Sequence, residues 1–421
     1  MRTLMIVLAA LLPTGVLAAE PSYPDLPPLS QVDAALNSNL NVMTAETGIK
    51  VEQANQRRWE AGNHEFNMRV GAARRQVVSA EQRLREWDVA LERAVRLPGK
   101  SGIDSDIGAE GVRRAEFALG DARHEASRQL LHLWFNWQRE RAQAGQWQAQ
   151  VDILGQQVAM TEKRLAAGDA PRMELNQVRA VMAQAAVALQ QARVRTEFAA
   201  NELIRLFPDL VLPQEVTPVT PQPVDHDLAY WRSRILDENH ELGMVQSEAR
   251  IQHLVAQRNR ADRTADPTLG VRFSSEMGGN ERVTGVYVVV PFSFGVRDAV
   301  AQGSVYQAEI AAEREAAVRR RLESDVLNAY NQSVGNFVTW QQAHDAATGM
   351  RENADLIARA YSLGERSLSD VLAARRLALE SSLAETVAQM DANEARYRLI
   401  LDAHMLWPLE HEAHTAGGGA R

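Results

Sequence analysis

The chain has 421 residues, of which 45% are hydrophobic and 24% charged, so it is expected to fold rather than remain disordered. Its formal net charge of −8, with no run of basic residues, argues against nucleic acid as a main partner. Cysteine is absent, which excludes disulfides, thiolate metal sites, a cysteine nucleophile and a lipidated N-terminal cysteine.

The N-terminus has the pattern of a secretory signal peptide. Arg2 gives a short positive start, residues 4–12 are apolar, and small residues follow around Ala18 and Ala19. The apolar run is shorter than the roughly 20 residues that a membrane-spanning helix needs. We therefore expect residues 1–19 to be removed from an exported chain, with cleavage at Ala18 or at Ala19.

Proline placement divides the chain into two long halves. Five prolines and no glycine lie within residues 207–224, which predicts a stiff, extended linker. The stretches 99–170 and 292–407 contain no proline and are rich in good helix formers. The predicted units are a first repeat at 20–206, the linker at 207–224, a second repeat at 225–407 and a flexible tail at 408–421.

The two halves fall into register when one is shifted by 196 positions. Gly168 then meets Gly364, and Glu174 meets Asp370. The agreement at this single offset extends over residues 130–204, which indicates an internal duplication.

Each half predicts the same order of elements. In the first half, residues 29–61 are expected to form a helix, two alternating stretches within about 64–97 to form strands, and residues 107–167 to form a long helix. Gly168 marks a tight turn into a returning helix at 172–206.

The second half repeats this pattern. A helix is expected at 225–264, strands within about 268–294 with the second at 283–294, and long helices over about 298–401 with a turn at Gly364. The fold class is therefore mostly α with a small β part, built as a duplicated helix, β-hairpin and long helical hairpin.

The spacing of apolar residues predicts assembly of several chains. The helix 172–206 carries a coiled-coil seam, and the helix 367–401 carries two stripes side by side, as a closed ring of helices requires. Four strands cannot close a barrel, since small barrels need about eight, and open sheet edges are not tolerated in lipid. The alternative is a soluble coiled coil with two β-hairpins.

The turn between the last two long helices resembles a known motif. Residues 360–372, with the sequence AYSLGERSLSDVL, resemble the periplasmic tip of TolC-type outer membrane factors. Residues 164–168, together with Glu174 and Leu175, resemble the matching tip of the first repeat. The segment Arg96–Lys100 resembles the metal-efflux, CzcC-like branch of this family.

The resemblance implies a homotrimer in the cell outer membrane that extends into the periplasm. Three chains would build one outer-membrane β-barrel joined to a periplasmic α-helical barrel. The implied function is the exit duct of a tripartite efflux system for heavy-metal cations or drugs. A periplasmic adaptor and an inner-membrane transporter of the resistance–nodulation–division type would feed it. A duct for type I protein secretion and a periplasmic coiled-coil scaffold without a pore are the alternatives.

The resemblance also implies a periplasmic gate at the helical tips. Tyr361 and Arg366 match gate residues of the second repeat, and Glu174 matches their acidic partner in the first. Asp370 matches an acid that forms a ring around the trimer axis and binds cations. The family's second acidic position is Ala373 here, so a weaker cation block is expected. Capping of a helix start is the alternative role for both acids.

Motifs typical of enzymes are absent from the sequence. It contains no phosphate loop, metalloprotease helix motif or nucleophile elbow, so we expect no enzyme activity, cofactor or resident metal. His404, His411 and His414 are interpreted as part of a polar C-terminal tail, with metal binding as the alternative. Four arginines near the strands either line a polar lumen or lie at the rim facing lipid headgroups: Arg69, Arg74, Arg75 and Arg272.

Overall fold

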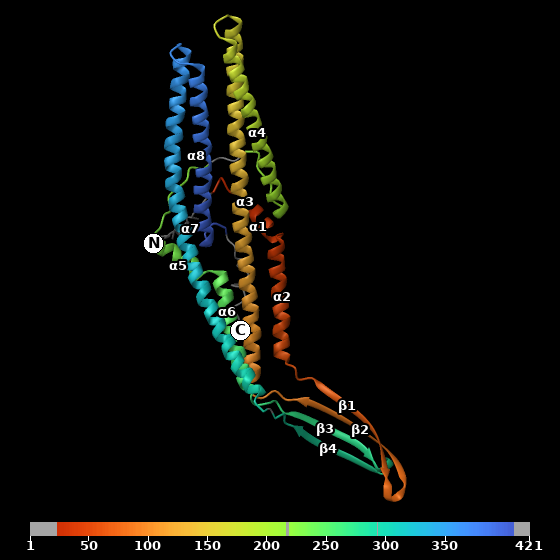
Figure 1. Ribbon diagram of the computed structural model, residues 1–421. Helices are drawn as coiled ribbons and strands as arrows, with labels where there is room; N and C mark the ends of the chain where they lie inside the picture. Colours follow the sequence, from red (N-terminus) through yellow and green to blue (C-terminus); the bar gives the residue numbers. More distant parts are fainter. Residues whose placement is uncertain (1–22, 216–218, 293, 408–421) are drawn as a thin grey trace, which may run out of the picture.

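The computed structural model describes residues 23–215, 219–292 and 294–407. They form an elongated molecule in which long helices carry a small β-sheet at one end (Figure 1). The predicted signal peptide at 1–19 and the predicted tail at 408–421 lie outside the described residues.

The first helical segment is divided in two. α1 (Leu29–Asn37) and α2 (Leu40–Ala61) replace the single helix expected over 29–61. Between them Asn39 is extended, and its side-chain oxygen accepts a hydrogen bond from the Asn41 N–H at 3.0 Å. Asparagine is a preferred N-cap residue, so it starts a new helix here and the prediction of one continuous helix was wrong.

The second half breaks in the same way. α5 (Leu228–Asp237) and α6 (His240–Ala261) replace the single helix expected over 225–264. The Asn239 side chain accepts a hydrogen bond from the Leu242 N–H at 2.8 Å and caps α6. An asparagine N-cap thus divides the corresponding segment of each half.

The strands of both halves form one antiparallel sheet in the order β1-β2-β3-β4, so that β2 pairs with β3 across the two halves. The last strand ends at Val289 instead of reaching residue 294, because Pro291 has no N–H to donate to a ladder. The strands and the short 3₁₀ turns in their hairpins are β1 (Phe66–Val77), η1 (Val78–Ala80), β2 (Gln82–Ala94), β3 (Thr268–Glu276), η2 (Met277–Gly279) and β4 (Glu281–Val289).

The long helices occur as two equal pairs. α3 (Lys100–Ala166) and α7 (Val296–Ser362) have 67 residues each, and α4 (Arg172–Leu206) and α8 (Leu368–Asp402) have 35 each. A helix of 67 residues is about 100 Å long. Their starts differ by 296 − 100 = 196 and 368 − 172 = 196 positions, the offset found in the sequence. The duplication itself stays a prediction.

α3 begins earlier than expected. It starts at Lys100 and not near Ile107, because Gly99, with a φ of 88°, turns the chain directly from the sheet connection into the helix. Within the described ranges, none of the helices is both long and apolar enough to span a lipid bilayer.

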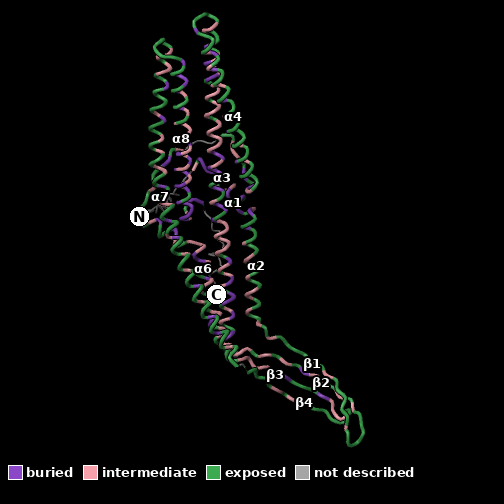
Figure 2. Tube along the Cα trace, in the orientation of Figure 1, coloured by how far each residue is buried: buried purple, intermediate pink, exposed green. Residues whose placement is uncertain are grey.

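The main core lies where the short helices meet the middle of the long ones (Figure 2). Trp134, Phe135 and Tyr397 are buried there. Tyr397 Oη donates to Asp25 Oδ1 at 2.7 Å, and Trp134 Nε1 donates to the Asp25 carbonyl at 2.8 Å. These contacts tie the segment before α1 to α3 and α8. Towards the tips only narrow seams are buried, and the buried residues of α4 are Leu175, Val178, Ala185, Leu189, Ala192, Ala199 and Leu203.

Candidate functional site

The two helical turns lie at the end of the molecule opposite the sheet (Figure 1). Gly168 follows α3 with a φ of 78°, and Gly364 follows α7 with a φ of 81°. Both are positive-φ positions at a helix C-terminus, which glycine adopts without strain. The two glycines predicted for the tips therefore make the turns.

Tyr361 connects the two tips within one chain. Its hydroxyl accepts a hydrogen bond from Arg164 Nη1 and donates to Glu174 Oε2 at 3.5 Å. Arg164 Nη1 also lies 3.8 Å from Glu174 Oε2, and the guanidinium carbon lies 5.4 Å from the centre of the Tyr361 ring. Two residues predicted for the gate, Tyr361 and Glu174, are thus brought together, with Arg164 between them.

The protonation of Tyr361 suits this contact. Burial raises the pKa of the phenol, the charge of Arg164 opposes this, and the Glu174 carboxylate raises the pKa further. A phenol that stays protonated accepts from Arg164 while donating to Glu174. The three groups therefore form a charge-assisted chain of hydrogen bonds between the two hairpins.

Arg164 was not predicted to take part in this contact. It lies one helical turn before Gly168, where its Nε donates to Asp169 Oδ2 at 3.0 Å and its Nη2 donates to the Asp169 carbonyl at 3.0 Å. The residue that matches Arg164 at the offset of 196 is Ala360. The match between the two halves therefore does not predict a role for Arg164. The sequence feature that could have indicated Arg164 is an arginine before, and an aspartate directly after, the turn glycine Gly168.

An apolar cluster supports the contact from below. Leu154 of α3 and Val178 of α4 are buried against Leu368 and Leu372 of α8, and Tyr361 packs on the same cluster. The start of α8 is therefore held against the first hairpin by burial as well as by the polar contact.

Asp370 and Arg366 lie beside this contact without joining it. The Asp370 carboxylate accepts from the Ser367 N–H at 3.2 Å, and Ser367 Oγ accepts from the Asp370 N–H at 3.2 Å. This is a capping box at the start of α8. The bond from the Ser367 backbone lowers the pKa of Asp370, and Arg366 contributes through its positive charge. The gate roles of both residues stay predictions.

Loss of the cap should loosen the first turn of α8. Ser367→Ala is expected to cost about 1 kcal/mol locally, which raises amide exchange in that turn about fivefold. Hydrogen exchange at Asp370 and Val371 measures this. Ser367→Asp keeps an acceptor at the N-cap and serves as the control. If Ser367→Asp raised amide exchange as much as Ser367→Ala does, the N-cap would not contribute to the stability of the turn.

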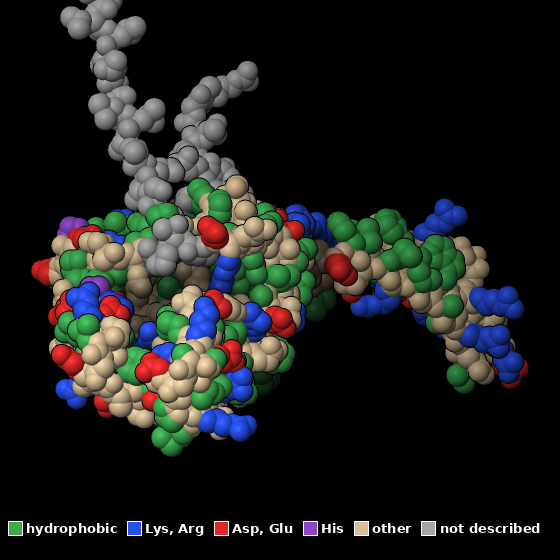
Figure 3. Space-filling view, turned by 90° about the horizontal axis from the view of Figure 1, so that it is seen from above, with side chains coloured by type: hydrophobic (Ala, Val, Ile, Leu, Met, Phe, Trp, Pro, Cys, Tyr) green, Lys and Arg blue, Asp and Glu red, His purple; other side chains and the backbone are tan. Residues whose placement is uncertain are grey.

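One face of the sheet is apolar and exposed. We call it the apolar face; Met68 is 72% exposed on it and Val286 is 84% exposed. Figure 3 shows hydrophobic side chains covering much of the sheet. The strand register places on this face Phe66, Met68, Val70, Ala72, Trp87, Val89, Leu91, Leu269, Val271, Phe273, Val286 and Val288.

The opposite face, which we call the polar face, carries ion pairs. Arg69 Nη2 donates to Glu92 Oε1 at 3.3 Å, and Tyr287 Oη donates to Glu92 Oε2 at 2.7 Å. Arg75 Nε donates to Glu86 Oε1 at 2.6 Å. One surface of the sheet thus suits lipid and the other suits water.

The register also separates the arginines that the sequence left together. Arg69, Arg75 and Arg272 lie on the polar face, whereas Arg74 lies on the apolar face near the end of the β1–β2 hairpin. The position of Arg69, Arg75 and Arg272 fits residues that line a polar lumen. The position of Arg74 fits a residue at the rim that faces lipid headgroups.

Solved structures share the fold of this chain over nearly its whole length. The Campylobacter jejuni CmeC outer membrane channel has a TM-score of 0.70 at 15% identity, covering 96% of this chain and 94% of that one. The Vibrio cholerae outer membrane protein VceC has a TM-score of 0.73 at 16% identity, covering 89% and 95%. The Neisseria gonorrhoeae MtrE outer membrane channel has a TM-score of 0.64 at 17% identity, covering 90% and 89%. The chain has the fold of these channels. No family model and no curated protein matches the sequence.

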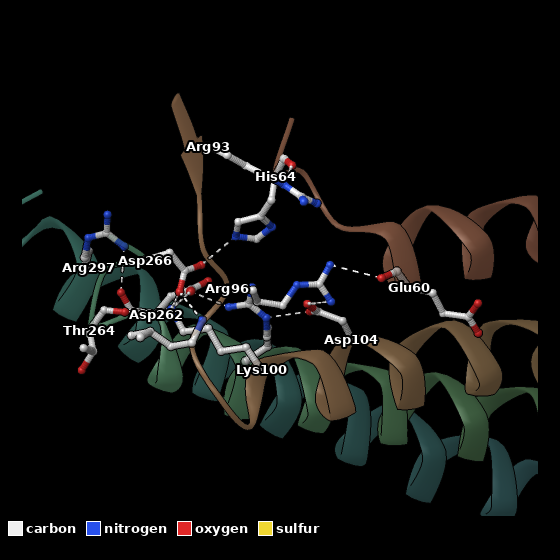
Figure 4. A network of polar contacts seen from close by, with 12 residues as sticks. Glu60, His64, Arg93, Arg96, Lys100, Asp104, Asp262, Thr264, Asp266 and Arg297 are labelled. Atoms are coloured by element: carbon white, nitrogen blue, oxygen red, sulfur yellow. Dashed lines mark hydrogen bonds and ion pairs between the residues drawn. The ribbon is translucent and has the colours of Figure 1, made fainter. Parts of the chain in front are cut away.

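In this channel fold, a buried charge cluster fixes the joint between helices and sheet (Figure 4). Lys100 Nζ lies 2.8 Å from Asp262 Oδ1 and 2.8 Å from Asp266 Oδ1, and it donates to the Thr264 carbonyl at 2.8 Å. The Lys100 side chain is only 3% exposed. The segment Arg96–Lys100, which resembles the metal-efflux branch, therefore has a structural part in linking the two halves.

His404 belongs to the helical body of this channel fold and not to a polar tail, so that interpretation was wrong for this residue. Its ring centre lies 5.0 Å from that of His124 and 4.9 Å from that of His240. Burial lowers the pKa of His404 to about 4, and the electrostatic interaction with His124 acts in the same direction. His411 and His414 lie outside the described residues. Over the described ranges, no three His, Asp or Glu side chains are arranged to hold a metal ion.

Proposed function

We propose that the chain is one of three identical subunits of an outer-membrane channel that serves as the exit duct of a tripartite efflux system. The observation that carries the proposal is the sheet with one exposed apolar face and one polar face. An exposed face of this kind suits lipid, and the polar face behind it suits a water-filled lumen. The channel fold supports the same conclusion.

The free edges of the sheet favour a trimer. In one chain, β1 and β4 each pair on one side only, so a row of backbone groups on each remains unpaired. In lipid, each unpaired group costs several kcal/mol. If β4 of each chain pairs with β1 of the next chain in a ring of three, no strand edge is left unpaired. The ring has 3 × 4 = 12 strands, more than the roughly eight that small barrels need.

The helices also present a surface for neighbouring subunits. α3 and α7 have the same length, but α3 buries 19 of its residues and α7 buries only eight. Exposed apolar side chains along α7 include Val300, Tyr306, Ile310, Leu327 and Val338. Helices of adjacent chains would cover them, as in a closed ring of helices.

The remaining partners follow from this assignment. A periplasmic adaptor would dock at the helical tips, and an inner-membrane transporter of the resistance–nodulation–division type would supply the substrate. We propose heavy-metal cations or drugs as substrates, with the metal-efflux branch suggested by Arg96–Lys100. The channel would conduct passively and catalyse no reaction.

A pair of arginine substitutions tests the lipid-facing surface. Val70→Arg, on the apolar face, is expected to cost up to about 2–4 kcal/mol and to reduce the amount of trimer in the outer membrane. Ala73→Arg, on the polar face of the same strand, is the matched control and should assemble normally. Trimers are measured as heat-modifiable bands in outer-membrane fractions. Equal trimer yields from the two variants would contradict the assignment of the faces.

A deletion strain then distinguishes the possible cargoes. Sensitivity to metals or to drugs on deletion would support efflux, and retention of a secreted protein would support a type I secretion duct instead. Recovery of the mature chain as a soluble monomer in the periplasm would exclude a channel and leave the coiled-coil scaffold.

A further inference from the structure

Four arginines gather at the free end of the apolar face, beyond its hydrophobic residues. They are Arg74 on β1, Arg83 and Arg85 on β2, and Arg282 on β4, and all four are exposed. The register puts them on the same face as Val70, Val89 and Val286. Figure 3 shows basic side chains gathered toward this end of the sheet. We call this set the arginine rim.

The rim is strained as it stands, because like charges face each other. Arg74 lies directly opposite Arg85 in the β1–β2 ladder, and Arg83 is two residues from Arg85 on the same face. Like charges placed directly opposite on one face of a sheet destabilise it. An anion from outside that lay between the guanidinium groups would relieve this repulsion.

The protein does not supply that anion. Three acids at this end of the sheet lie on the polar face, namely Glu86, Glu276 and Glu281. Of these, Glu86 and Glu276 pair with Arg75. Within the described residues, Glu81 of the β1–β2 turn forms no ion pair with a rim arginine. In the part of the chain that the structure describes, no member of the arginine rim forms an ion pair. The positive charge of the rim is therefore available to a ligand.

The height of the rim is close to that of a membrane boundary. Along β2, Arg93 at the base and Arg85 at the rim are eight residues apart, about 27 Å along the strand. At the usual tilt of about 35–45° this corresponds to a height of about 19–22 Å. The apolar band of an outer-membrane strand is about 25 Å tall. Aromatic side chains mark both borders: Phe66 lies 4.8 Å from the Arg93 guanidinium, and Trp87, next to the rim, is 53% exposed. Aromatic residues at both interfaces are typical of membrane strands.

We propose that the arginine rim binds the phosphate groups of an anionic lipid in the outer leaflet, with the acyl chains lying on the apolar face below. Arginine binds phosphate through two parallel hydrogen bonds, and guanidinium groups facing one another can share one phosphate. The proposal rests on the proposed function, since it places the hairpins at the outer surface. Arg282 lies on edge strand β4 and Arg74 on edge strand β1, so closing the ring would join the rims of adjacent chains.

The first test needs no substitution. Purified trimers are placed in phosphatidylcholine nanodiscs that contain lipid A, dephosphorylated lipid A or neither, and their thermal dissociation is measured. Lipid A alone should raise the dissociation temperature. Equal stabilisation by dephosphorylated lipid A, or by inorganic phosphate added to plain nanodiscs, would overturn the proposal.

The second test uses variants. In the triple variant Arg74→Gln, Arg83→Gln, Arg85→Gln, the apparent affinity for lipid A should fall by about tenfold or more, because each lost charge-assisted bond lowers it. The double variant Arg69→Gln, Arg272→Gln, on the polar face, is the matched control and should bind as the wild type does. Indistinguishable affinities of the two variants for lipid A would refute lipid binding by the arginine rim.

These outcomes are separate from those that test the channel itself. Normal trimers in the outer membrane that conduct ions but show no preference for phosphorylated lipid would refute the arginine rim and leave the channel proposal intact. Failure of the wild-type chain to enter the outer membrane would overturn both.

Discussion

Replacing Lys100 with methionine is expected to lower the free energy of unfolding by about 3–5 kcal/mol. The Lys100 ammonium is the shared partner of Asp262 and Asp266, whose side chains are 36% and 16% exposed. Methionine fills much the same volume, so the main loss is the charge. Asp262 keeps its ion pair with Arg258, but the ammonium that the two carboxylates share is lost from a partly dry joint. Removing one member of a buried ion cluster costs more than the cluster contributes.

The measurement is chemical unfolding of the purified protein in detergent. Lys50→Met, on the exposed surface of α2, is the matched control and should change the unfolding free energy by less than about 0.5 kcal/mol. A loss for Lys100→Met as small as that of the control would show that the cluster contributes little to the joint.

The same cluster makes the stability of the joint depend on pH. Burial raises the pKa of Asp262, but hydrogen bonds from Arg258 and Lys100 outweigh burial, and the pKa is lowered. The pKa of Asp266 is lowered in the same way, chiefly by Lys100. A lowered folded-state pKa stabilises the fold above the unfolded pKa of about 4, and this stability is lost as the pH falls through the folded value. The wild type should therefore lose stability below about pH 4, and Lys100→Met should lose less there.

The start of α3 shows why propensity alone misplaced a helix. Gly102 lies before Ile107 and has a poor helix propensity, so a helix start before it is not favoured by propensity. A Cβ added to Gly108 would lie 2.9 Å from Gln56 Cα, so glycine is what lets α2 pack against α3. The close contact is a property of the pair of helices and is not visible in either one alone.

In the sheet, the sequence pattern predicts the individual strands but not how they pair. The alternation of Phe66, Met68 and Val70 predicts a strand with one apolar face, because side chains on a strand alternate with a period of two. No local pattern predicts that β2 pairs with β3, since that ladder joins residues such as Ala90 and Arg272 from different halves of the chain. The charge cluster around Lys100 brings these strands together, and its partners are scattered in the sequence.

At the tips, the resemblance identified Tyr361 and Glu174, and the structure places them in contact. Residue spacing did not identify Arg164, because a side chain that bridges two hairpins has no fixed position relative to either turn. The ring proposed for Asp370 depends on neighbouring chains, so a single subunit reveals only its cap at the start of α8.

Arg164→Ala is expected to raise the open probability of the channel about 5- to 30-fold per subunit. Arg164 donates to Tyr361 and lies 3.8 Å from Glu174, and its side chain is 38% exposed, so a contribution of about 1–2 kcal/mol is reasonable. The contact joins the two hairpins, so losing it favours states in which the hairpins separate. Single-channel recordings in planar bilayers measure this.

The control is an ion pair of the same kind that does not join the hairpins. Arg179 Nη2 lies 2.6 Å from Glu162 Oε1, and both residues belong to the α3–α4 hairpin. Arg179→Ala should leave the open probability unchanged. An equal increase in both variants would indicate general loosening of the tips and would contradict a latch formed by Arg164.

A double-mutant cycle with Tyr361→Phe shows whether the contact acts as one unit. Phenylalanine keeps the packing against the apolar cluster and removes the hydroxyl that joins Arg164 to Glu174. If the two side chains form one latch, the double variant opens no more than Arg164→Ala alone, because the contact is already lost. Independent contributions would multiply instead. A large increase from Arg366→Ser, a residue outside this contact, would place the gate between subunits and not within one.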